Sequence, residues 1–169
     1  DERNKLPLVR KGLQILTDGL RAEDRIAMVS YAGNSGLVLP ATPGDRKSTI
    51  RQAIRRLDAG GSTNGGEGIE LAYRVARENF IPGGVNRVIL ATDGDFNVGI
   101  TGEMALQRLI ETKAKSGVFL SVLGFGMGNL KDSTLEMLAD KGNGNYAYID
   151  SAEEAGKVLG TDATGTLLT

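Results

Sequence analysis

Hydrophobic and polar positions alternate along this chain with two spacings, one typical of helices and one typical of strands. Apolar residues three and four positions apart, from Leu6 to Leu20, give a first helix one apolar face. Unbroken aliphatic runs such as Val88–Leu90 are typical of strands that are buried on both sides in a parallel sheet. The expected helices cover residues 6–20, 50–57, 69–80, 103–115, 133–140 and 152–159, and the expected strands cover 26–31, 37–39, 87–92, 118–123 and 146–149. This alternating order predicts an α/β domain in which helices pack on a sheet.

Two loops of this predicted fold contain the candidate chemistry. Asp93-Gly94-Asp95 follows directly on the strand at 87–92, and the carboxyl ends of strands are where open α/β sheets bind ligands. The glycine-rich loop 60–66 contains the hydroxyl groups of Ser62 and Thr63. Carboxylate and hydroxyl oxygens are the ligands of hard cations, so the two loops together suit a divalent cation such as Mg²⁺.

Each loop also has a purely structural interpretation. The Thr63 hydroxyl could cap the helix that follows or form a hydrogen bond inside its own loop. Asp93-Gly94 could be a simple turn. Loop chemistry alone leaves these alternatives open.

Glycine-rich loops also suggest nucleotide binding, which the neighbouring residues argue against. A phosphate-binding Walker loop needs Lys and then Ser or Thr after its last glycine, whereas Gly65 is followed by Gly66 and Glu67. The segment 124–129 resembles a dinucleotide fingerprint, but Asn129 stands at the third glycine position. A tight turn is the favoured interpretation there.

Composition narrows the remaining classes of function. The 169 residues are most simply one domain, with 20 Lys and Arg against 21 Asp and Glu, so no basic excess favours nucleic-acid binding. The absence of His and Cys excludes thiolate nucleophiles and zinc-thiolate sites and removes the commonest general base. No stretch approaches the roughly 20 apolar residues of a transmembrane helix, so this segment is not expected to insert into a membrane.

Taken together, several segments resemble the von Willebrand factor type A (VWA) domain. Their sequences look like those of the bacterial branch of this family. The two loops have the expected positions, with Thr63 before a helix and Asp93 after a strand about thirty residues later. The matching segments are residues 24–31, 60–69, 87–97, 122–126 and 142–149, which extend over nearly the full length. The resemblance implies a Rossmann-like three-layer sandwich with a mostly parallel central sheet.

The resemblance also implies a metal-ion-dependent adhesion site at the strand ends. In the family, three loops supply its ligands: Asp-x-Ser-x-Ser after the first strand, a Thr in the second loop and an Asp in the third. By motif match, Thr63 is the second-loop ligand and Asp93 the third-loop ligand, while Asp95 lies beside the site without being expected to bind the ion. Mg²⁺ or another divalent cation is the implied cofactor.

The first of these three loops is missing from the sequence. No Asp-x-Ser-x-Ser occurs, and the chain begins directly with the first helix. The family's first strand lies centrally in its sheet, so we expect residues 1–160 to be a VWA domain without that strand, followed by a tail at 161–169. We also expect the chain to be an excerpt whose first strand precedes Asp1. One carboxylate and one hydroxyl would bind Mg²⁺ weakly or not at all.

The expected function is that of a protein-binding module without enzymatic activity. A cation held at Thr63 and Asp93 would keep one open position, which an Asp or Glu of a partner protein would fill. Two alternatives remain: a Mg²⁺-dependent hydrolase or phosphotransferase, for which Asp93 and Asp95 would be the paired acids, and a structural VWA-like domain with a degenerate site. The sequence identifies neither the partner protein nor the oligomeric state.

Overall fold

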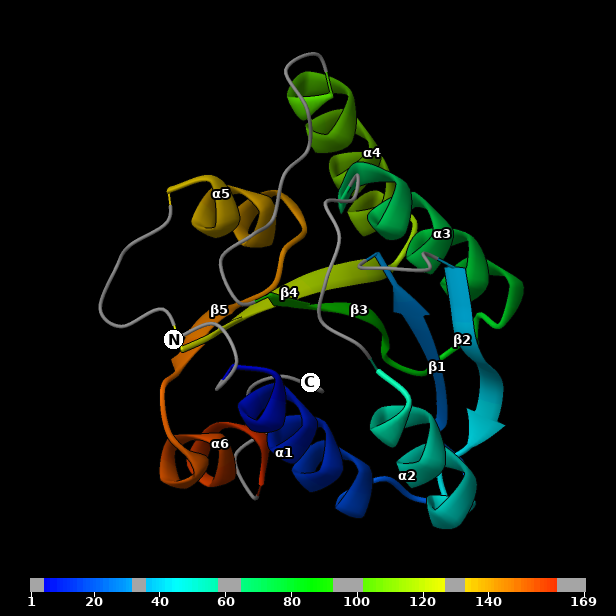
Figure 1. Ribbon diagram of the computed structural model, residues 1–169. Helices are drawn as coiled ribbons and strands as arrows, with labels where there is room; N and C mark the ends of the chain where they lie inside the picture. The colour runs from blue at the N-terminus through cyan, green and yellow to red at the C-terminus, as the bar shows by residue number, and fades with distance from the viewer. Residues whose placement is uncertain (1–4, 32–35, 58–64, 93–101, 127–132, 161–169) are drawn as a thin grey trace.

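The computed structural model describes residues 5–31, 36–57, 65–92, 102–126 and 133–160. Helices and strands alternate along these residues, as the sequence predicts. The elements in chain order are α1 (Lys5–Asp18), β1 (Arg25–Ser30), β2 (Gly36–Pro43), α2 (Lys47–Arg55), α3 (Gly65–Glu78), β3 (Asn86–Thr92), α4 (Glu103–Lys115), β4 (Val118–Phe125), α5 (Ser133–Lys141), β5 (Tyr146–Ile149) and α6 (Ala152–Leu159). The strands lie between one group of helices formed by α3, α4 and α5 and another formed by α1, α2 and α6 (Figure 1). This is the predicted three-layer α/β sandwich.

The strands of the described residues form two sheets. In one sheet β3, β4 and β5 run parallel, with β4 in the centre, and each residue of β3 from Asn86 to Thr92 has a partner in β4. In the other sheet β1 and β2 are antiparallel, and their register is irregular around Met28. Most of the described strands are therefore parallel, but no ladder among them joins β1 to β3.

Side-chain packing connects the two sheets, which no backbone ladder joins among the described residues. On one face, α3 contributes Ile69 and Tyr73 to the core that covers β3, and the same core reaches Tyr31 just beyond β1. On the opposite face, Val9 of α1 packs against the core below β4, while Leu13 of the same helix packs against the core below β1. Both α1 and α3 therefore span the two sheets.

The end of α5 brings the chain unusually close to β4. Asn143 has the left-handed φ of 56° that often follows a helix, and the Gly144 N–H donates to the Ala139 carbonyl at 2.9 Å. A Cβ at Gly144 would lie 1.8 Å from the Leu120 carbonyl oxygen in β4. Only glycine allows the backbone to come this close before β5 begins.

Tyr73 is a buried polar residue within the apolar core beside α3. The residue is 1% exposed, and among the described residues no group forms a hydrogen bond with its hydroxyl. Burial raises the pKa of Tyr73 well above its ordinary value.

The described helices include none long and apolar enough to cross a membrane.

We expect Tyr73→Phe to increase the free energy of unfolding by about 1 kcal/mol, because it keeps the ring and removes a buried hydroxyl that has no partner in the described part of the chain. The raised pKa of Tyr73 also makes the free energy of unfolding depend on pH. The unfolded chain releases this proton at lower pH than the folded one, so Tyr73 contributes stability that is lost as pH rises above about 10. Urea unfolding of both proteins at pH 8 and pH 10.5 checks this: the gain from Tyr73→Phe should be larger at pH 10.5, and an equal or smaller gain would contradict it.

Candidate functional site

The residues predicted to bind the cation lie outside the described part of the structure. This applies to Thr63 and Asp93, and also to the neighbouring Asp95, which is not expected to bind the ion. Their coming together remains a prediction. The structure does place the elements next to the two loops, namely α3 after the Thr63 loop and β3 before the Asp93 loop.

Buried residues directly flank both loops. Thr92 is the last residue of β3, is 2% exposed, and lies opposite Gly124 of β4, so the chain reaches Asp93 from the edge of the parallel sheet. Gly65, two residues after Thr63, is the buried first residue of α3. Since α3 packs on β3 through Ile69 and its neighbours in one core, both loops are attached to elements that contact each other.

The first turn of α3 is also held against the end of β1. A Cβ at Gly68 would lie 2.6 Å from the Cβ of Tyr31, so glycine is what allows this close contact. Glu67 occupies the first turn of the same helix, where the helix dipole favours a negative charge. The start of α3 therefore has a defined position between β1 and β3.

The turn after β4 begins with Gly126, a glycine of the dinucleotide-like segment. Gly126 has a φ of +65°, and its N–H donates to the Ile149 carbonyl at 2.9 Å. A Cβ at this position would lie 3.0 Å from the side chain of Lys5. Gly126 thus forms a tight turn against β5 and α1, and residues 127–129 of the dinucleotide-like segment lie outside the described residues.

The described residues do not form a cation site by themselves. Nowhere in the described ranges do three or more Asp, Glu, His or Cys residues come together in a way that could hold a metal ion. A cation site at this edge of the sheet would therefore depend on the loops that contain Thr63 and Asp93. Their oxygen chemistry fits Mg²⁺ but supplies only part of its coordination.

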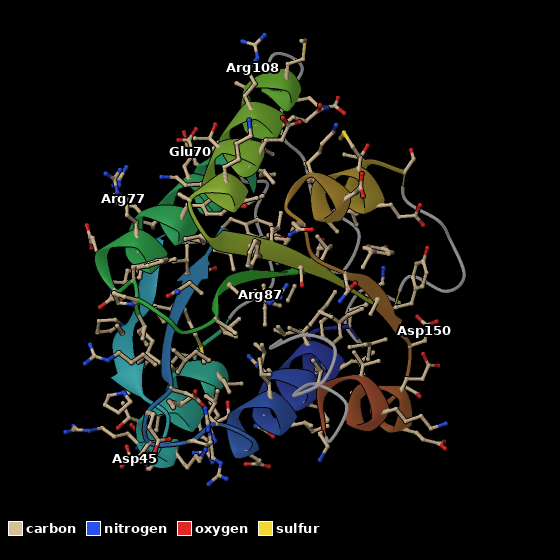
Figure 2. The ribbon with its side chains drawn as sticks, turned by 180° about the vertical axis from the view of Figure 1, so that it is seen from behind. Asp45, Glu70, Arg77, Arg87, Arg108 and Asp150 are labelled. Atoms are coloured by element: carbon tan, nitrogen blue, oxygen red, sulfur yellow. The ribbon has the colours of Figure 1, made fainter. Side chains whose placement is uncertain are left out.

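A half-buried cation that sequence reasoning missed, Arg87, belongs to the start of β3, the end opposite Thr92. Arg87 donates to the Ser121 hydroxyl at 2.7 Å, and its guanidinium carbon lies 5.9 Å from the centre of the Phe119 ring. Burial lowers the pKa of Arg87. Arg87 is the second residue of β3, and its guanidinium reaches Ser121, which pairs with Ile89 in the middle of that strand (Figure 2).

Comparison with known proteins finds relatives along the whole chain. The chain is 48% identical to the protein YfbK of Escherichia coli (strain K12) over 169 residues, which are 100% of this chain and 29% of YfbK. It is 27% identical over 150 residues to the protein sll0103 of Synechocystis sp., covering 89% of this chain and 35% of that protein. The chain thus spans about a third or less of these relatives, both of which are bacterial.

Solved structures and a family model agree with these relatives. A von Willebrand factor type A protein from Catenulispora acidiphila matches with a TM-score of 0.76 at 21% identity, over 94% of this chain and 37% of that one. The vWF domain of the type V pili tip protein Mfa5 from Porphyromonas gingivalis matches with a TM-score of 0.68 at 12% identity, over 96% and 88%. Likeness at this level of identity shows the fold. The family model described as the von Willebrand factor type A domain matches residues 2–161, and the chain therefore belongs to the von Willebrand factor type A family.

Proposed function

We propose that this domain is a protein-binding module that uses a divalent cation to bridge to a carboxylate of its partner. Domains of this family commonly act as protein-interaction modules. In the proposed site, the Thr63 hydroxyl and the Asp93 carboxylate bind Mg²⁺, and an Asp or Glu of the partner fills an open coordination position. Polar and apolar contacts around the ion then determine which partner binds.

One structural observation supports this proposal above all others. The loop with Thr63 ends at the start of α3, the loop with Asp93 begins at the end of β3, and α3 packs directly on β3. Two short loops attached to touching elements are well suited to share one ion. The carboxyl end of β3 is also the edge at which α/β sheets usually bind their ligands.

The residues of this chain alone would give a weak site. Mg²⁺ prefers six oxygen ligands in octahedral geometry, and Thr63 and Asp93 replace only two of its waters. The Asp-x-Ser-x-Ser loop that the family uses is not in the sequence. We therefore expect this chain to bind the cation in the millimolar range, on the order of −4 kcal/mol.

The first experiment titrates the 169-residue chain with Mn²⁺, a paramagnetic substitute for Mg²⁺, and follows backbone amide signals by NMR. We expect selective broadening of amides next to the ligands, such as those of Gly65 and Thr92, and recovery of the signals after EDTA or excess Mg²⁺. Asp93→Ala should abolish the broadening because it removes the only carboxylate ligand. Asp140→Ala removes an exposed carboxylate from α5 and should leave the broadening unchanged.

Two results would contradict the proposal. Broadening that survives Asp93→Ala would place the cation elsewhere, and no selective broadening up to tens of millimolar would favour the structural domain with a degenerate site. The proposal also includes the absence of catalysis. With Mg²⁺ present, the chain should not release phosphate from an aryl phosphate, and release that Asp93→Ala abolishes would support the hydrolase instead.

A further inference from the structure

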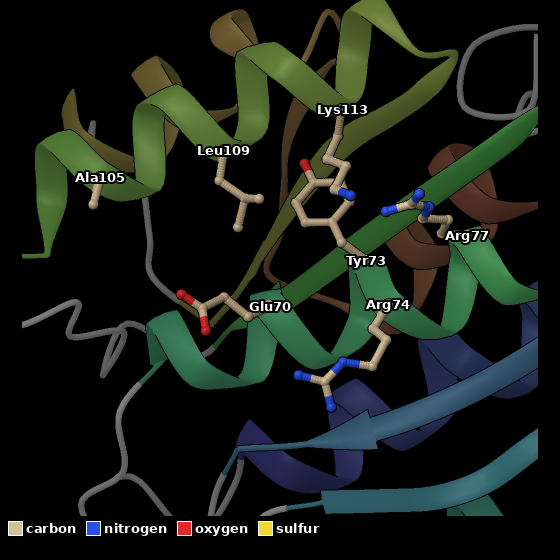
Figure 3. Close-up of a pocket in the computed structure, with 7 residues that line it drawn as sticks. All are labelled: Glu70, Tyr73, Arg74, Arg77, Ala105, Leu109 and Lys113. Atoms are coloured by element: carbon tan, nitrogen blue, oxygen red, sulfur yellow. The ribbon is translucent and has the colours of Figure 1, made fainter.

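An open cavity of about 420 Å³ lies on the surface between α3 and α4. We call it the α3–α4 groove. Its walls include the apolar side chains of Ala105 and Leu109 from α4 and the ring of Tyr73 from α3 (Figure 3). The described residues that line it all belong to α3 and α4.

Positive charge dominates the walls of the groove. Arg74 and Arg77 of α3 and Lys113 of α4 line it, together with one carboxylate, Glu70. In Figure 3, Arg77 and Lys113 extend toward the Tyr73 ring, and Arg74 extends away from α4. Among the described residues, none of these three cations has an ion-pair partner. The Glu70 carboxylate lies nearer the Leu109 end, so the charges are unevenly distributed along the groove.

The Tyr73 hydroxyl adds a buried hydrogen-bond donor to this charged region. The residue is 1% exposed, its hydroxyl has no hydrogen-bond partner among the described residues, and its ring points from α3 toward α4 between Leu109 and Lys113. A buried hydroxyl that makes no hydrogen bond destabilises the fold. A ligand oxygen that reached this hydroxyl after the covering side chains moved aside would offset that loss.

We propose that the α3–α4 groove binds the phosphate group of a phosphate monoester. Arg77 and Lys113 would supply charge. The Tyr73 hydroxyl, which is covered in this structure, would donate a hydrogen bond to one oxygen once the side chains above it move aside. A phosphate dianion matches the two cations that extend toward the Tyr73 ring, Arg77 and Lys113, and its oxygens fit the fork of an arginine. Leu109 and Ala105 provide apolar contact for the organic part of the ligand. This inference does not depend on the proposed cation site.

The test uses the 169-residue chain, with phenyl phosphate and inorganic phosphate as probes, followed by amide NMR at constant ionic strength. We expect both probes to shift amides of residues 70–77 and 105–113, with phenyl phosphate binding several-fold more tightly because its ring contacts Leu109. Sodium chloride at the same ionic strength should not produce these shifts. Asp93→Ala and EDTA should not affect phosphate binding, so failure of one proposal is distinguishable from failure of the other.

Matched variants distinguish a specific phosphate site from non-specific attraction of phosphate to positive charge. Tyr73→Phe, Arg77→Gln and Lys113→Gln should each weaken phenyl phosphate binding by about tenfold, the usual effect of losing one hydrogen bond to a charged group. Lys115→Gln removes the same charge from the same helix outside the groove and should change affinity less than twofold. The proposal is overturned if Tyr73→Phe and Arg77→Gln bind as the unmodified chain does, or if Lys115→Gln weakens binding as much as Lys113→Gln. Circular dichroism confirms that each variant remains folded.

Discussion

Replacing Gly144 by alanine is expected to destabilise the domain by about 3 kcal/mol or more. The added Cβ would lie 1.8 Å from the Leu120 carbonyl oxygen and 2.6 Å from its carbon. Leu120 cannot easily move aside, because its strand, β4, lies between β3 and β5 in the parallel sheet. Gly144 is equally fixed, since its N–H donates to Ala139 at the end of α5. Urea unfolding followed by circular dichroism measures the loss.

Gly156→Ala is the matched control for this experiment. It makes the same chemical change inside α6, where no atom lies within 4 Å of the added Cβ. Alanine is the better helix former by about 0.5–1 kcal/mol, so this variant should be more stable than the unmodified chain. Opposite signs for the two variants would confirm that the contact with Leu120 causes the loss, whereas a small effect of Gly144→Ala would show that this region can relax.

Phe125→Ala is expected to cost about 3–5 kcal/mol. Phe125 is the last residue of β4, is fully buried, and packs in the core between the sheet and the helices α1 and α6. Truncation would leave a cavity that its neighbours fill only in part. Phe80→Ala removes a ring that is 41% exposed and should cost about 1 kcal/mol or less. Equal losses in the two variants would contradict the assignment of Phe125 to the core.

A double-mutant cycle tests the contact between Phe125 and α1 directly. A Cβ at Gly12 would lie 2.8 Å from the Phe125 ring, so Gly12→Ala alone should be destabilising. Phe125→Leu makes room at the same point. We therefore expect the double variant to lose less stability than the sum of the two single variants, and strict additivity would show that the two positions do not interact.

Most elements of the fold could be predicted because their apolar patterns are regular. The bounds of α4, β5 and α6 are those expected from the sequence. The first helix ends at Asp18 rather than at Leu20, since Gly19 turns the chain with its N–H bonded to the Leu16 carbonyl. The third helix likewise ends at Glu78, which leaves Phe80 beyond it.

The second strand was harder to predict because of its composition. It covers Gly36–Pro43 rather than only residues 37–39. Pro40 and Pro43 argue against a central strand, but β2 pairs only with β1 among the described strands, with an irregular register that tolerates proline.

The candidate sites differ in how much the sequence could reveal. Thr63 and Asp93 were identified by motif, and their meeting at one ion remains a prediction. The α3–α4 groove had no such signal, because it depends on two helices about forty residues apart lying next to each other. Tyr73 fits the apolar face of a helix, so only the structure reveals that none of the described residues forms a hydrogen bond with its hydroxyl.

The separation of the described strands into two sheets has a mechanical consequence. Because α1 and α3 connect the sheets through side chains, sliding one sheet relative to the other breaks no backbone ladder between β1 and β3. Apolar contacts have little directional preference and re-form after small displacements, unlike hydrogen bonds. Shear between the two sheets would therefore break no ladder hydrogen bond among the described strands, and α3, which contacts both sheets, would move with it.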